Sequence, residues 1–187
     1  MTGLRPAEGS AVRGPVTVAV KAADPSRISR LTLWTGDRQL AQVLARDGLG
    51  VRLDTRRFPD GELAFAVDSR DWPGNTGRRE WRVRVDNTPP VLRVVRTFAV
   101  PRPKGAKPDP KRKRQAFVVL SARDTGAPQM TLTLSAPGVK PRTVSLRAVR
   151  NRRIPVGRLL PGRNVIRLQL RDAAGNVRTS NHVLRFR

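Results

Sequence analysis

The same turn sequence occurs twice in this chain, each time between two short alternating runs. The first copy is Arg-Asp-Trp-Pro-Gly-Asn at residues 70–75, and the second is Arg-Asp-Ala-Ala-Gly-Asn at residues 171–176, so the two Asp residues lie 101 positions apart. Further upstream, the segment 20–24 (Val-Lys-Ala-Ala-Asp) matches the segment 120–124 (Leu-Ser-Ala-Arg-Asp) at nearly the same offset. Repetition over the length of a domain indicates two copies of one domain.

Short segments with a period of two residues predict the fold of each copy. Between 15 Gly and 16 Pro residues, apolar and polar residues alternate as they do in half-buried strands. No apolar stripe with helical spacing persists for three turns. We therefore predict an all-β protein made of two tandem immunoglobulin-like antiparallel β-sandwich domains, each of about seven strands. Strand parity places these residues in the two cores: Phe65, Val67 and Trp81 in the first, and Leu168, Leu170 and Phe186 in the second.

The boundary between the copies is predicted at the segment 85–91, Val-Asp-Asn-Thr-Pro-Pro-Val. Two consecutive prolines cannot donate to a ladder and favour an extended link. We assign residues 1–88 to the first domain and residues 89–187 to the second. The second copy also contains an insertion at 101–114, which is too polar and rich in proline to fold alone and is expected to form a mobile loop between its first two strands.

These motifs, taken in order, resemble bacterial Ig-like domains. The family pattern has an opening Pro-x-x-Gly-x-x-Val, an Ala-x-Asp strand end and a closing Asp-x-x-Gly-Asn hairpin, and the first half matches it at residues 6–12, 22–24 and 71–75. The second half lacks the opening motif and carries the insertion. The resemblance implies a spacer or adhesion module of a secreted or surface protein.

Charge separates the two copies. Of the net charge of +24, residues 1–88 contribute +4, from 15 basic and 11 acidic residues, and residues 89–187 contribute +20, from 23 basic and 3 acidic residues. A field of that strength attracts anionic polymers or surfaces, such as cell-envelope polymers, glycans or nucleic acid, and weakens as salt rises. Parity and the basic run together predict these anion-binding residues: Lys111, Arg112, Lys113, Arg114, Arg167, Arg171, Arg185 and Arg187.

Catalytic chemistry is not indicated. The chain has no Cys, and its single His, His182, falls on the inward parity of its strand, so a nucleophile and base pair or a zinc site is not expected. No pair of the 14 acidic residues has a spacing that suggests a glycosidase. Asp24, Asp86 and Asn87 offer oxygen ligands for calcium, but the interpretation as turns and strand caps is favoured. We expect no enzyme activity, no cofactor and no metal.

The preferred hypothesis is a spacer and adhesion module of a bacterial extracellular or envelope protein, whose second domain is an electrostatic anchor. Residues 1–10 contain no apolar segment of a signal peptide, so we expect the chain to be a segment of a longer protein with other domains. One alternative is an intracellular basic protein that binds nucleic acid through residues 111–114; aromatic residues, at 4%, are too few to favour base recognition. Another alternative is an accessory carbohydrate-binding module that uses Trp34 and Trp72.

Overall fold

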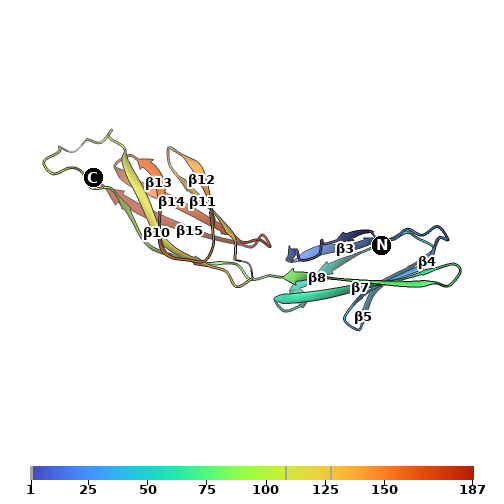
Figure 1. Cartoon of the computed structure of the whole chain (residues 1–187). Helices are drawn as coiled ribbons and strands as arrows, with labels where there is room; N and C mark the ends of the chain where they lie inside the picture. Colours follow the sequence, from blue (N-terminus) through green and yellow to red (C-terminus); the bar gives the residue numbers. More distant parts are fainter. Residues whose placement is uncertain (1, 108, 127) are drawn as a thin grey trace. The chain divides into compact units, whose positions relative to one another are not determined.

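The computed structural model describes residues 2–107, 109–126 and 128–187, and its strands form two compact units that divide between Thr88 and Pro89. Each unit contains two sheets, and Figure 1 shows their strands in two layers. The predicted all-β class with two tandem sandwiches is confirmed. The only helical element among the described residues is one 3-10 turn, η1 (Thr55–Arg57), and none of them forms a helix long and apolar enough to cross a bilayer.

Unit 1 has a three-stranded sheet and a five-stranded sheet. The first contains, in spatial order, β1 (Thr2–Arg5), β3 (Pro15–Lys21) and β6 (Gly48–Asp54). The second contains β2 (Ala11–Val12), β8 (Thr76–Val85), β7 (Gly61–Asp71), β4 (Ile28–Thr35) and β5 (Arg38–Leu44). The opening segment is thus divided between both sheets, because β1 pairs with β3 and β2 pairs in parallel with β8. This division gives unit 1 one strand more than the predicted seven among its described residues.

Unit 2 has a three-stranded sheet and a four-stranded sheet. The first contains β13 (Val149–Leu159), β10 (Arg114–Arg123) and β9 (Val91–Ala99). The second contains β12 (Val139–Leu146), β11 (Met130–Ala136), β14 (Gly162–Arg171) and β15 (Val177–Phe186). The edge strand β12 carries an exposed proline, Pro141, between two exposed cations, Lys140 and Arg142.

Each unit has its own apolar core, as strand alternation predicts. Phe65, Val67 and Trp81 are at most 2% exposed in unit 1, and Leu168 and Leu170 are fully buried in unit 2. Phe186 differs from the prediction, because it is half-buried at the margin of the core. The guanidinium carbon of Arg114 lies 4.8 Å from the centre of its ring and covers the face that the core does not.

Asn87 fixes the end of unit 1. Its Oδ1 accepts hydrogen bonds from the Gly14 amide at 2.9 Å and from the Thr55 hydroxyl at 3.1 Å. Its own amide N–H donates to Asp60 Oδ1 at 2.7 Å. The Asp-Asn-Thr sequence before the two prolines therefore closes the first sandwich before the link begins.

Candidate functional site: the basic surfaces of unit 2

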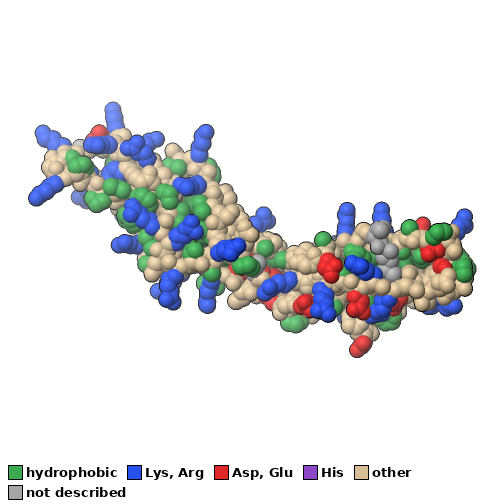
Figure 2. Space-filling model, viewed as in Figure 1, with side chains coloured by type: hydrophobic (Ala, Val, Ile, Leu, Met, Phe, Trp, Pro, Cys, Tyr) green, Lys and Arg blue, Asp and Glu red, His purple; other side chains and the backbone are tan. Residues whose placement is uncertain are grey.

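Carboxylates neutralise arginines on unit 1. Among the described residues, the assigned ion pairs join Arg56 to Asp54, Arg78 to Asp68 and Glu80, Arg79 to Glu8, and Arg82 to Glu62, and all lie in unit 1. Figure 2 shows acidic and basic side chains interspersed on the visible face of unit 1, whereas basic side chains dominate that of unit 2. The sequence difference of +4 against +20 is therefore also a difference in how the charges are compensated.

The predicted arginines of the last two strands lie on one exposed sheet face. Arg167 and Arg171 on β14 and Arg185 on β15 all point away from the core of the four-stranded sheet. Arg185 stands directly opposite Arg163, which sequence reasoning did not single out, and Arg167 stands opposite Asn181. Four residues separate Arg163 from Arg167 along β14, or about 13 Å at the rise of a strand. The charges therefore form a stripe along the sheet rather than one cluster.

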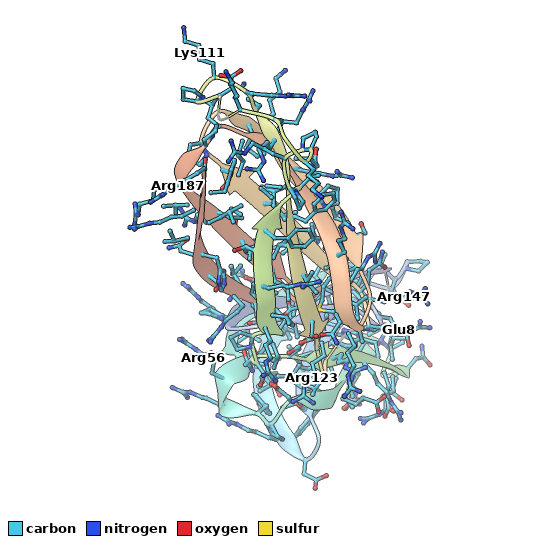
Figure 3. The ribbon with its side chains drawn as sticks, turned by 90° about the vertical axis from the view of Figure 1, so that its left-hand side faces the viewer. Glu8, Arg56, Lys111, Arg123, Arg147 and Arg187 are labelled. Carbon is cyan, nitrogen blue, oxygen red and sulfur yellow. The ribbon has the colours of Figure 1, made fainter. Side chains whose placement is uncertain are left out.

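The predicted basic run 111–114 divides between a loop and a strand. Lys111, Arg112 and Lys113 are exposed on the connection between β9 and β10, and Figure 3 shows Lys111 at the opposite end of unit 2 from Arg123. Arg114 instead begins β10 and is held in place. Its Nε and Nη2 donate to the Val100 carbonyl at 2.8 and 2.6 Å, and its Nη1 donates to the Arg187 carbonyl at 2.6 Å.

A second basic surface, on the other sheet of unit 2, was missed at the sequence level. Phe98 on β9 and Phe117 on β10 pair directly and stack with ring centres 5.5 Å apart, outside the core. The guanidinium of Arg153, on β13, lies 3.7 Å from the centre of the Phe117 ring, and that of Arg96 lies 5.2 Å from Phe98. A guanidinium that stacks on a ring keeps its N–H edge free for an anion and loses little freedom on binding. We call these four residues the Arg–Phe patch.

The two tryptophans proposed for carbohydrate lie apart. Trp34 lines a groove on the outer face of the five-stranded sheet, beside Thr32, Asp68 and Arg78. Its indole N–H is buried without a hydrogen-bond partner among the described residues. Trp72, 67% exposed, follows Asp71, which pairs with Ile28 at the opposite end of β4. Six residues of strand, about 20 Å, therefore separate the two positions along β4.

His182 lies on the inward side of its strand, opposite the buried Ile166, as Trp81 lies opposite Phe65 in unit 1. It is half-buried, and its Nε2 lies 2.7 Å from the Ser180 hydroxyl. Both residues of this contact lie on β15. His182 is therefore a partly buried residue packed at the margin of the sheet.

One side-chain oxygen of each residue considered for calcium, Oδ1, accepts hydrogen bonds in a turn or cap. Asp24 Oδ1 accepts the Ser26 amide at 2.8 Å, and Thr88 donates its amide to Asp86 Oδ1 at 3.3 Å. Asn87 Oδ1 accepts hydrogen bonds from the Gly14 amide and the Thr55 hydroxyl, as described above. These bonds agree with the interpretation as turns and strand caps.

The repeated Asp-x-x-Gly-Asn sequences form the same hairpin turn. In the first, Asp71 Oδ1 accepts the amides of Gly74 and Asn75 at 2.8 and 2.7 Å, and Oδ2 accepts Asn75 Nδ2 at 2.7 Å. In the second, Asp172 accepts the main-chain and side-chain N–H of Asn176, each at 2.8 Å. In both turns the Asp carboxylate accepts the main-chain amide of the Asn at the end of the hairpin. This hydrogen bond explains why Asn follows Asp by four residues in both copies.

This turn makes the stability of unit 1 depend on pH. The Asn75 side chain, and also the amides of Asn75 and Gly74, lower the pKa of Asp71 against the opposing effect of burial. A carboxyl group with a lowered pKa in the folded state stabilises the fold above its unfolded pKa of about 4, and this contribution disappears as pH falls through the folded value. We expect denaturant unfolding, followed by tryptophan fluorescence, to show a smaller loss of stability below pH 4 in Asp71→Asn than in the wild type. Asn75→Ala should move the acid transition to higher pH, and identical profiles for all three proteins would contradict the assignment.

Comparison with known proteins supports the fold. No protein-family model matches the sequence, and no curated protein is significantly similar to it. Among solved structures, the fibronectin(III)-like modules of CbhA from Clostridium thermocellum match with a TM-score of 0.60 and 10% identity, over 96% of this chain and 90% of that chain. A segment of two fibronectin type III domains from chicken tenascin matches with a TM-score of 0.35 and 12% identity, over 96% and 97% of the two chains. At 10% identity the CbhA match establishes fold alone. The chain thus has the β-sandwich fold shared by fibronectin type III-like and Ig-like modules.

Proposed function

We propose that this chain is a non-enzymatic spacer and adhesion module of a bacterial extracellular or envelope-associated protein, and that unit 2 anchors it to an anionic polymer. The observation that carries the proposal is the uneven compensation of charge: the assigned ion pairs lie on unit 1, while unit 2 has 23 basic and 3 acidic residues. Uncompensated cations on a folded surface bind polyanions by releasing their counterions.

Two exposed surfaces of unit 2 support such binding. The stripe on β14 and β15 presents exposed arginines, and the Arg–Phe patch presents two that are already oriented by their rings. They lie on different sheets of the unit, so a flexible polymer can contact either or wrap around the edge between them. Broad binding by charge, rather than recognition of one sequence of monomers, is what this distribution favours.

A salt series on the full chain tests the proposal, with linear polyphosphate as the probe. The logarithm of the binding constant should fall linearly with the logarithm of salt concentration. The triple variant Arg167→Gln, Arg171→Gln, Arg185→Gln should reduce that slope by about 2, because each lost contact removes somewhat less than one released ion. The control variant Arg38→Gln, Arg46→Gln, Arg52→Gln removes the same charge from exposed positions on unit 1 and should leave the slope within about 0.5 of the wild type. Equal slopes for the two variants would overturn the proposal.

The same assay addresses the two alternatives. Single-stranded oligonucleotides that bind with clear base preference would favour the nucleic-acid function over the envelope anchor. A neutral oligosaccharide that binds the wild type but not Trp34→Ala would favour a carbohydrate module, for which the groove beside Trp34 is the supporting observation. The anchor hypothesis expects neither result.

A further inference from the structure

The insertion in unit 2 builds a pocket at one end of the sandwich. Short turns shape it: the Ala106 amide donates to the Pro103 carbonyl at 3.1 Å, and the Arg112 amide donates to the Asp109 carbonyl at 3.3 Å. The Val100 amide donates to the Gln115 carbonyl at 2.8 Å, and the Arg114 side chain, which donates to two carbonyls, fixes the base of the loop. These bonds hold the described residues on either side of position 108 in turns and fix the base of the loop at the sheet end.

The pocket is small and has apolar walls with cations around them. Its volume is 270 Å³, and Val100, Pro101, Pro103 and Pro161 supply apolar surface. This volume lies below the range of about 300–1,000 Å³ typical of sites for whole small molecules, so a single chemical group fits better than a sugar ring with its substituents. Besides Arg114, the basic residues that line it are Arg102, Lys107, Arg112, Lys113, Arg158 and Arg187.

These cations have little compensation inside the pocket. Asp109 is the acidic residue that lines it, and its Oδ1 already accepts the main-chain amide of Lys111 at 2.8 Å. Arg102 Nη1 is buried and has no hydrogen-bond partner among the described residues. A guanidinium nitrogen without an acceptor is unfavourable, and several like charges around one cavity repel one another. A bound anion would relieve both.

We propose that this pocket binds one compact tetrahedral oxyanion, a phosphate or sulfate monoester, carried at the end or on a side branch of the polymer that unit 2 contacts. The proposal rests on the anchor function and adds a specific site to it. Several guanidinium groups match the spread oxygens of such a group, because each can donate two parallel N–H bonds. A carboxylate has a smaller charge and fewer acceptor oxygens, so it should bind less tightly.

The test is isothermal titration of the full chain with inorganic phosphate, sulfate and acetate at constant ionic strength. Phosphate or sulfate should bind saturably with a stoichiometry of one and more tightly than acetate. Arg102→Gln should weaken this binding about 10- to 100-fold, the usual effect of losing a hydrogen bond between charged groups. Arg147→Gln, which removes the same charge from an exposed position between β12 and β13, outside the pocket and both basic surfaces, should change it less than about two-fold. Preference for phosphate would identify a phosphorylated polymer as the source of the group, and preference for sulfate a sulfated one.

The possible failures are distinguishable. Absence of saturable binding, or equal losses in Arg102→Gln and Arg147→Gln, would overturn the pocket, and unchanged polyphosphate binding in the same buffer would leave the anchor function standing. Saturable phosphate binding without any polyphosphate binding would overturn the anchor instead. Circular dichroism verifies that Arg102→Gln folds, and Arg158→Gln, on the strand side of the pocket, provides a second variant with the same expected loss.

Discussion

Trp81→Ala should destabilise unit 1 by about 3–5 kcal/mol and leave unit 2 folded. Trp81 is 1% exposed, and the centre of its ring lies 5.2 Å from that of Phe65 on the neighbouring strand of the same sheet. The substitution removes this pair and leaves a cavity between the sheets, which the surrounding strands can only partly fill. Unit 2 has a separate apolar core and none of its buried residues packs against Trp81.

Hydrogen exchange resolved by peptide measures this effect, since it reports on the two units separately. Peptides from residues 1–88 should lose protection, while those from 89–187 keep it. Trp81→Phe is the matched control: it keeps an aromatic ring against Phe65 and removes an indole N–H that has no hydrogen-bond partner among the described residues, so the loss should be clearly smaller than that of Trp81→Ala. Equal losses for the two variants would contradict the importance that we assign to ring packing.

Gly157→Ala should destabilise unit 2 by about 2–4 kcal/mol, because two effects combine. Gly157 has φ of +138°, which other residues adopt only with strain, and it lies at a β-bulge where Ala116 pairs with Gly157 but Phe117 pairs with Pro155. An added Cβ would also come within 2.6 Å of Val139 Cγ1 on β12. The bulge thus brings strands of the two sheets into close contact.

Two further variants separate strain from crowding in the same denaturation experiment. Gly162 also has a positive φ, +110°, but an added Cβ would meet nothing within 4 Å, so Gly162→Ala should cost only the backbone contribution of about 1–3 kcal/mol. Adding Val139→Ala to Gly157→Ala should recover part of the loss by removing the clash. If Gly157→Ala and Gly162→Ala are equally unstable and Val139→Ala gives no recovery, the close approach of β12 and β13 is wrong.

Alternation and repetition predicted much of the fold. The parity of Phe65, Val67, Leu168 and Leu170 follows from the strand period alone, since each lies in the middle of a strand with a neighbour on both sides. Phe186 does not follow that rule, because its cover comes from Arg114, which is distant in sequence. Strand parity predicts on which face of the sheet a side chain lies. It does not predict which other side chain covers that residue at the end of the sheet.

The candidate site was harder to predict for the same reason. Parity correctly identified Arg167, Arg171 and Arg185 as exposed on one sheet, because they alternate with buried residues in regular strands. The Arg–Phe patch could be predicted only if the register of β9, β10 and β13 were known. The insertion separates β9 from β10, and the sequence does not give its conformation. The alternation of Arg96 with Phe98 was the available signal. The contribution of Arg102 to the pocket depends on the conformation of the loop, for which no periodic pattern exists.

The edge strand β12 has a consequence for how this protein behaves at high concentration. A free sheet edge is a template on which a strand of a second molecule can add, and this is a common route to aggregation. Pro141 lacks the N–H that such an added strand would require, and Lys140 and Arg142 would bring like charges together when two copies approach. Where many copies are crowded on one surface, addition of one copy to another through the β12 edge is therefore disfavoured.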